Sequence, residues 1–179
     1  MSDYTSCFIG IPLPEKYQES FQNLLKEIFQ INPLTLYYLD KQSQTDLPKI
    51  TENIKNHLEI LKGVKLKIKG SGYFRGNDPR VLFLDVQHPK ALQEFNKVIT
   101  ESLSTYSAPD NNLPFHPHVT VAWVGDPESQ QAFKAHQSNL KTLLDKVNWP
   151  FEITEVVLYG ADSTKKPECQ EKLISLEVK

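Results

Sequence analysis

The stretch FHPHVTVAWV, residues 115–124, decides how the rest of this sequence is interpreted. It reads as a β-strand, in which alternate side chains share one face. His116, His118 and Thr120 would therefore point one way, and the apolar Val119 and Val121 the other. A purely structural strand would alternate simple polar residues with apolar ones. Two imidazoles and a hydroxyl on one face suggest a chemical role, with a partner elsewhere in the chain.

The composition of the 179-residue chain is that of one soluble globular domain, with 39% hydrophobic and 23% charged residues. Its formal net charge of −2 argues against a large basic nucleic-acid groove but is compatible with a local phosphate site. Cys7 and Cys169 make neither a disulfide framework nor a CxxC metal pattern. Residues 1–17 contain no basic leader and no membrane-spanning apolar run. We therefore expect a cytoplasmic monomer without a membrane segment.

Hydrophobic periodicity predicts alternating strands and helices along the chain. Strands are predicted over residues 7–11, 33–39, 65–70, 81–86, 115–124, 151–161 and 172–178. Amphipathic helices are predicted over residues 15–29, 49–61, 90–103 and 127–146. The glycine- and asparagine-bearing segment 70–79 is expected to form a loop. The lysine-rich strand before it is expected to be exposed or to lie at a sheet edge, where lysines prevent aggregation.

The order strand, proline, helix, strand occurs twice in this sequence. The first copy contains Leu34-Thr35-Leu36 in its last strand, and the second contains Val119-Thr120-Val121. A repeat of fixed order indicates a duplicated unit. Duplication would bring Thr35 and Thr120 to equivalent, facing positions.

The flanks of the second copy resemble the 2H phosphoesterase superfamily, which includes the RNA 2′,3′-cyclic phosphodiesterases, also called 2′–5′ RNA ligases. Residues 115–122, FHPHVTVA, are close to the family pattern F-x-P-H-[IV]-T-L-A, with His118-Val119-Thr120-Val121 as its H-x-[ST]-x motif. CFIGIPLP, GSGYFRGNDPRVLFLDV and FEITEVVLYGADSTK are also similar to family segments, so the resemblance covers nearly the whole chain. It implies an α+β fold over residues 1–179, a single domain made of two pseudo-symmetric lobes. Each lobe would be an antiparallel-rich sheet with outer helices, and each would give one motif to a central cleft.

The first motif departs from the family pattern. Aligned by its flanks, the first histidine falls on Pro33 of Pro33-Leu34-Thr35-Leu36, and no histidine precedes His57. A second departure is Trp123, where many members carry an arginine. Arg80 or Arg75 from the middle loop could supply the missing positive charge.

Hydrolysis of a cyclic phosphate needs a general base for water and a general acid for the departing ribose oxygen. Histidine suits both tasks because its pKa lies near neutrality. The resemblance therefore implies a metal- and cofactor-independent site with His118, Thr120 and Thr35 as catalytic residues. Its ligand would be an RNA end or nucleotide with a cyclic phosphate. Proline has no ionisable group, so Pro33 cannot serve in such a pair.

Three interpretations remain open. In the first, catalysis persists with Tyr37 or His116 replacing the lost histidine, and these two residues and Arg80 bind the substrate. Tyr37 is expected on the same strand face as Thr35, and Tyr38 in the core. The aromatic rings of Tyr73, Phe74 and Tyr37 could stack on bases or belong to the core. In the second, the protein only binds a nucleotide or RNA phosphate end. In the third, the His116-x-His118 pair binds zinc with a further ligand from His136 or Asp126.

Overall fold

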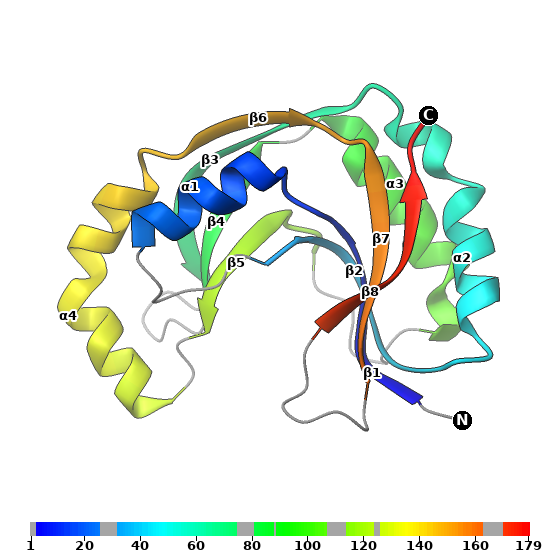
Figure 1. Ribbon diagram of the computed structural model, residues 1–179, viewed down its shortest axis with the longest axis horizontal. Helices are drawn as coiled ribbons and strands as arrows, with labels where there is room; N and C mark the ends of the chain where they lie inside the picture. Colours follow the sequence, from blue (N-terminus) through cyan, green and yellow to red (C-terminus); the bar gives the residue numbers. More distant parts are fainter. Residues whose placement is uncertain are drawn as a thin grey trace.

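The computed structural model describes residues 3–25, 32–74, 81–87, 89–106, 114–123, 126–162 and 170–179. These residues form two four-stranded antiparallel sheets with helices packed on their outer sides (Figure 1). The predicted α+β fold with two lobes is therefore confirmed. No helix in the described part of the chain is long and apolar enough to cross a membrane.

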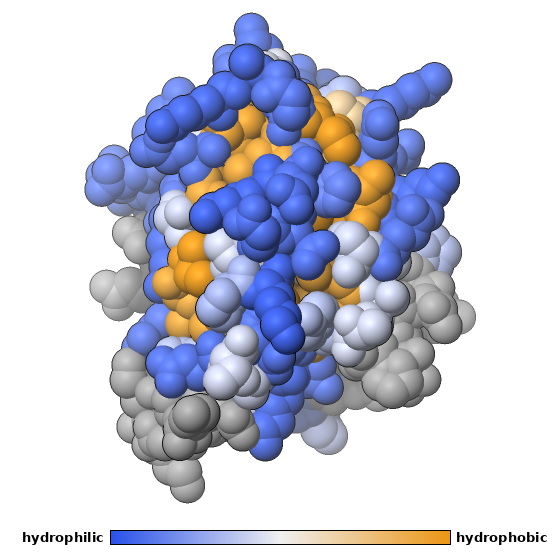
Figure 2. Space-filling view, turned by 90° about the vertical axis from the view of Figure 1, so that its right-hand side faces the viewer, coloured by the Kyte–Doolittle hydropathy of each residue, from blue (hydrophilic) through white to orange (hydrophobic). Residues whose placement is uncertain are grey.

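The first sheet, here called sheet A, contains both ends of the chain. Its strands, in spatial order, are β2 (Leu34–Ser43), β1 (Asp3–Ile11), β7 (Glu155–Asp162) and β8 (Gln170–Glu177). On its outer side lie α2 (Leu47–Lys55), the 3₁₀ helix η1 (Leu58–Leu61), α3 (Lys90–Ser102) and the 3₁₀ helix η2 (Ser104–Tyr106). Figure 2 views the side on which α2 lies; hydrophilic side chains dominate it, with hydrophobic patches between them. The apolar residues of α2 instead face the core.

The second sheet, sheet B, is built from the middle of the chain. Its strands, in spatial order, are β5 (His118–Trp123), β4 (Val81–Gln87), β3 (Lys65–Phe74) and β6 (Asn148–Glu152). Its outer helices are α1 (Glu15–Leu25) and α4 (Pro127–Leu144). Tyr17 of α1 stacks on Trp149 with 5.0 Å between ring centroids, and its hydroxyl donates to the carbonyl oxygen of Pro150 at 2.6 Å. These contacts hold α1 against β6.

Two helices pack on the opposite sheet from the strand that precedes them in the chain. Helix α1 follows β1 of sheet A but packs on sheet B, whereas α3 follows β4 of sheet B but packs on sheet A. In the second case the Asn96 amide donates to the carbonyl oxygen of Leu36 at 2.7 Å. In sheet A, β2 lies at one edge with β1 beside it, and in sheet B, β5 lies at one edge with β4 beside it. In both sheets the edge strand is the second strand of a strand–helix–strand unit, and its neighbour is the first. A duplication would produce this equivalence, and the duplication itself remains a prediction.

The sheets meet where β2 and β5 approach each other. The backbone N–H and the side-chain amide of Asn32 both donate to the carbonyl oxygen of Thr120, at 3.3 and 3.1 Å. Asn32 lies just before β2, and Thr120 lies inside β5. This clamp places the start of β2 next to the middle of β5, and each of these is an edge strand of its sheet.

The predicted single strand 151–161 is wrong. The chain leaves sheet B after β6 and enters sheet A at β7, with Ile153 and Thr154 between the two strands. The Ile153 N–H donates to the carbonyl oxygen of Val64 at 2.9 Å, and its side chain is buried. Periodicity reports which face is apolar but not which sheet a strand joins, so this crossing was invisible in the sequence.

The predictions for residues 65–74 were also partly wrong, and residues 75–79 of the predicted loop lie outside the described residues. Strand β3 continues to Phe74, and it pairs with β4 on one side and β6 on the other, so it is not an edge strand. Gly70 has a φ of +96° at a register shift between Ile68 and Ser71. Glycine adopts this conformation without a Cβ clash. The glycine that suggested a loop therefore forms a bulge within the strand.

Two helix predictions need adjustment. The helix predicted over 15–29 is observed to Leu25, and the rest of that prediction lies outside the described residues. The helix predicted over 49–61 is two pieces, α2 and η1.

Candidate functional site

A cavity of about 690 Å³ lies between β2, α3, the end of β3 and the segment that enters β5. It is lined by Thr35, Leu36, Tyr37, Tyr38, Phe74, Asn96, Thr100, Pro114, Phe115, His116 and His118. The fold therefore brings together four of the residues singled out in the sequence, which are Thr35, Tyr37, His116 and His118.

His118 is the first residue of β5, and one of its ring nitrogens is fixed by the backbone. Nδ1 lies 2.7 Å from the carbonyl oxygen of His116. A carbonyl can only accept, so Nδ1 carries the proton of the neutral ring and Nε2 has the free lone pair. No hydrogen-bond partner approaches Nε2 among the described residues.

Two phenyl rings enclose the His118 imidazole. Phe74 and Phe83 meet it edge to face, with centroid distances of 4.8 and 5.4 Å. Burial lowers the pKa of His118 from its ordinary value of 6.5, although the carbonyl of His116 opposes this effect. At neutral pH the ring is therefore unprotonated and able to accept a proton through Nε2.

His116 lies before the strand rather than in it, because β5 begins at His118. The flanking Pro114 and Pro117 have no N–H with which to join a ladder. The imidazole is nevertheless 6.2 Å from that of His118, centroid to centroid. Its Nε2 lies 3.3 Å from Oδ1 of Asp85, and about half of its side chain is exposed, 49%.

The expected orientation of the two tyrosines is reversed. The β1–β2 register pairs Thr35 with Gly10 and Tyr37 with Ile9, which leaves Leu36 as an extra residue. Such a bulge changes which face the following residues occupy. Tyr37 turns toward the core and is 6% exposed, although its atoms still line the cavity, whereas Tyr38 is 39% exposed.

Thr120 shares a strand face with His118, because the β4–β5 pairing is regular from His118 to Thr120. It is not among the cavity-lining residues. Its carbonyl oxygen accepts the two hydrogen bonds from Asn32 described above. Pro33 lies between this clamp and β2, while Arg80 and Arg75 lie outside the described residues.

The structure does not support the zinc interpretation. The described residues contain no group of three or more histidine, cysteine, aspartate or glutamate side chains that could hold a metal ion. His136 lies on α4, on the outer side of sheet B.

A family model described as the 2′-5′ RNA ligase superfamily matches residues 34–165, which is more than half of the chain. The protein belongs to this superfamily. The match begins one residue after Pro33, the position at which the first motif departs from the pattern. No curated protein matches the sequence.

Solved structures share the fold at low sequence identity. Escherichia coli LigT complexed with 3′-AMP is 17% identical, with 98% of each chain covered and a TM-score of 0.66. The LigT complex with NADP+ gives 17% identity, the same coverage and a TM-score of 0.64. TT0787 of Thermus thermophilus gives 17% identity, 97% coverage of each chain and a TM-score of 0.68.

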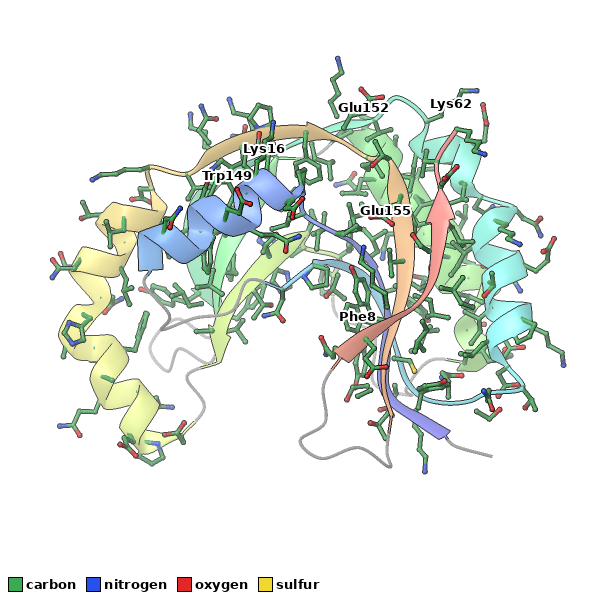
Figure 3. All side chains as sticks on the ribbon, viewed as in Figure 1. Phe8, Lys16, Lys62, Trp149, Glu152 and Glu155 are labelled. Carbon is green, nitrogen blue, oxygen red and sulfur yellow. The ribbon has the colours of Figure 1, made fainter. Side chains whose placement is uncertain are left out.

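Within this superfamily fold, the face of sheet A that carries Thr35 continues across the sheet. Thr35 pairs with Gly10, Gly10 with Val157, and Val157 with Ser175. Directly paired residues share a face. Phe8 (labelled in Figure 3) also lies on this face and stacks on Tyr159 with 4.9 Å between centroids. This pair is the counterpart in sheet A of Phe83 and Phe74, whose centroids are 4.5 Å apart.

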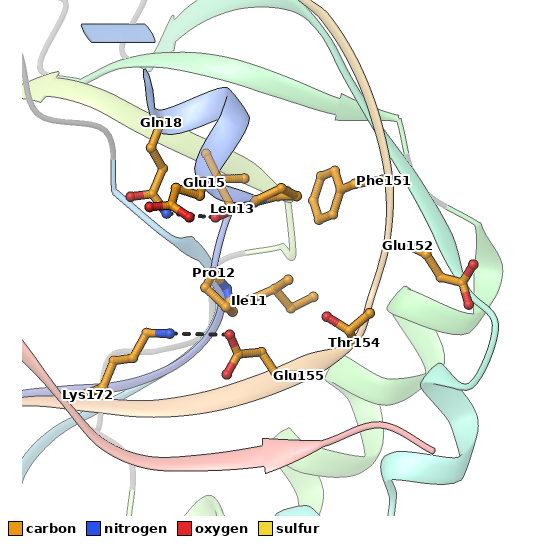
Figure 4. Close-up of a pocket in the computed structure, with 11 residues that line it drawn as sticks. Ile11, Pro12, Leu13, Glu15, Gln18, Phe151, Glu152, Thr154, Glu155 and Lys172 are labelled. Atoms are coloured by element: carbon orange, nitrogen blue, oxygen red, sulfur yellow. Dashed lines mark hydrogen bonds and ion pairs between the residues drawn. The ribbon is translucent and has the colours of Figure 1, made fainter. Parts of the chain in front are cut away.

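A second pocket, of about 280 Å³, lies beside the start of α1 and the strands β7 and β8 (Figure 4). Lys172 Nζ is 3.2 Å from Oε1 of Glu155, and the Gln18 amide donates to the carbonyl oxygen of Leu13 at 2.7 Å. These polar groups satisfy one another, and no imidazole lines this pocket in the described chain. We therefore place the candidate site in the larger cavity.

The sequence interpretation missed Asp85 and Phe83, and it considered Phe74 only as an aromatic on which a base could stack. Asp85 is the carboxylate that contacts His116, and Phe74 and Phe83 enclose His118. The signal for Asp85 was a lone carboxylate in the otherwise apolar run VLFLDV. No comparable signal marked Phe83, because its position depends on strand pairing.

Proposed function

We propose that this protein is a phosphodiesterase that opens 2′,3′-cyclic phosphates at RNA or nucleotide ends. The observation that carries the proposal is the state of His118. Its Nδ1 is hydrogen-bonded to a carbonyl, its Nε2 has no partner among the described residues, and its ring lines the cavity. An imidazole in this state is suited to act as a general base.

In the proposed reaction, His118 removes a proton from water as the water oxygen attacks phosphorus. The bond from phosphorus to one ribose oxygen breaks, and that oxygen takes a proton from a general acid. The hydroxyls of Thr35 and Thr120 would hold the phosphoryl oxygens, where hydrogen bonds stabilise developing negative charge. Arg80 and Tyr37 would help to bind the substrate. This scheme uses only side chains of the protein, with no metal or cofactor.

The fold supports a nucleotide as ligand. LigT, which shares this fold, was crystallised with 3′-AMP and with ATP. The cavity of this protein has aromatic walls, including Tyr38 and Phe74, on which a base could stack. We propose that the protein works as a cytoplasmic monomer on such ends.

The test is turnover of a short RNA ending in a 2′,3′-cyclic phosphate, with EDTA present. The native protein should open the ring, and His118→Ala should lower kcat by ~10²–10⁴-fold because the base is lost. His57→Ala is the matched control, since His57 lies at the end of α2, next to η1. Equal rates in His118→Ala and the native protein would refute the assigned role.

A second candidate function, binding without turnover, is favoured by one observation. Pro33 cannot transfer a proton at the position where the superfamily pattern has its first histidine. If the native protein bound this RNA without opening the ring, and His118→Ala weakened binding, the protein would be a phosphate-end binding module.

A further inference from the structure

We propose that His116, held by Asp85, supplies the second proton-transfer group, so that both imidazoles come from the β5 side of the cavity. This inference rests on the proposed function and identifies the general acid that the first motif lacks. The two proton-transfer groups would then both lie on the β5 side of the cavity, instead of one coming from each lobe.

The geometry places both imidazoles against one ligand. His116 and His118 both line the cavity, and their ring centroids are 6.2 Å apart. A proton-transfer group must come within ~2.6–3.2 Å of the atom it serves. Two rings at this separation can each reach a different oxygen of one phosphoryl group. Phe74 and Phe83 contact both imidazoles, at centroid distances between 4.8 and 5.6 Å, which restricts the orientation of both rings.

The hydrogen bonds of the two rings are complementary. His118 uses Nδ1 for the carbonyl and leaves Nε2 as an acceptor, which suits a base. His116 uses Nε2 for the Asp85 carboxylate, and its Nδ1 has no hydrogen-bond partner among the described residues. The Asp85 carboxylate accepts from Nε2–H and so fixes the His116 ring, which leaves Nδ1 to donate a proton to the leaving oxygen. The two rings thus have opposite roles.

The tyrosines of β2 are less suited to this task. Tyr37 is 6% exposed and turned toward the core. The Tyr38 hydroxyl is engaged with Oδ1 of Asp40 at 3.4 Å. The lining residues from α3 are Asn96 and Thr100, which do not titrate near neutral pH. Asp85, His118 and these two tyrosines are therefore the titratable groups that face His116 in the described chain.

The charge balance agrees with this assignment. The cavity has no lysine or arginine among its described lining residues. A protonated His116 would place a positive charge beside the bound phosphodiester. During turnover His118 gains the proton of water, and His116 loses one to the ribose oxygen. A proton exchange through solvent then restores both rings.

The test compares His116→Gln, Asp85→Asn and His118→Ala on a nucleoside 2′,3′-cyclic phosphate and on a nitrophenyl phosphodiester. The nitrophenolate leaves without protonation, so only the base is needed for the second substrate. We expect His116→Gln to lower kcat on the cyclic phosphate by ~10²–10⁴-fold, and to retain most of its activity on the nitrophenyl ester. His118→Ala should lose both activities. Activity on the nitrophenyl ester also shows that the His116→Gln site is folded.

Asp85→Asn provides an independent readout, because an amide orients the His116 ring less firmly than a carboxylate does. Asp85→Asn should therefore lower kcat on the cyclic phosphate and keep most of the activity on the nitrophenyl ester, in the same pattern as His116→Gln. If His116→Gln kept the native kcat on the cyclic phosphate while His118→Ala was inactive, the inference would be overturned and the proposed function would stand. An inactive native protein would overturn both.

Discussion

At the residue scale, the environment of His118 determines its chemistry. The same side chain on an exposed strand would be protonated below its ordinary pKa of 6.5 and would exchange freely between tautomers. Here two phenyl rings bury the imidazole and a backbone carbonyl selects one tautomer. The histidine itself was predictable from the motif. Its environment was not, because Phe74 and Phe83 lie far from it in the sequence.

The lowered pKa of His118 can be measured directly. Burial lowers this pKa below 6.5 in the folded protein, whereas the unfolded chain titrates near ~6.5. The stability contributed by the neutral ring is therefore complete above the unfolded value and is lost as pH falls through the folded pKa. NMR titration of the ring should show the low value. Urea unfolding should show a larger loss of stability between neutral and acidic pH in the native protein than in His118→Gln. A ring that titrates at or above 6.5 would contradict this account.

At the element scale, bulges explain why several predictions failed. The strand pattern 33–39 was correctly identified, but Leu36 is an extra residue against β1, so Tyr37 and Tyr38 exchange faces. The alternation of apolar and polar residues with a period of two cannot reveal an inserted residue. The extension of β3 past Gly70 was not predicted for a similar reason, because a glycine within a strand has the same composition signal as a loop.

Gly72 shows how closely the strands of sheet B pack beneath the site. A Cβ at this position would lie 2.7 Å from Cζ of Phe83 and 3.0 Å from a second ring carbon. Gly72→Ala should therefore displace the Phe83 ring and destabilise the protein by ~1–3 kcal/mol, as overpacking generally does. Chemical denaturation measures this loss. The same substitution in a Phe83→Leu background is the control, and an equal loss there would rule out the clash as its cause.

At the scale of the whole molecule, the site depends on how the two sheets meet. The cavity takes residues from β2 and α3 on one side and from β3 and the segment before β5 on the other. The repeat in the sequence predicted two units with Thr35 and Thr120 in equivalent, facing positions, and the structure confirms the two lobes. The exchange of α1 and α3 between sheets could not be predicted, because helix periodicity identifies an apolar face but not its partner.

The clamp between the sheets should contribute measurably to stability. Asn32→Ala removes the side-chain hydrogen bond to the carbonyl oxygen of Thr120 and leaves the backbone one. We expect the free energy of unfolding to fall by ~0.5–1.5 kcal/mol, the usual net value of one such bond. Asn53→Ala is the comparison, because its amide donates an exposed hydrogen bond to the carbonyl oxygen of Lys49 within the same helix. Similar unfolding curves for Asn32→Ala and the native protein would show that the clamp is unimportant.

The central claim is that the cavity hydrolyses a cyclic phosphate rather than only holding one. The most direct measurement is incubation of a nucleoside 2′,3′-cyclic phosphate with the native protein in H₂¹⁸O, followed by mass spectrometry of the product. We expect a nucleoside monophosphate with one ¹⁸O atom in its phosphoryl group, formed by the native protein and not by His118→Ala. Recovery of unchanged cyclic phosphate across neutral pH would show that the cavity does not hydrolyse it.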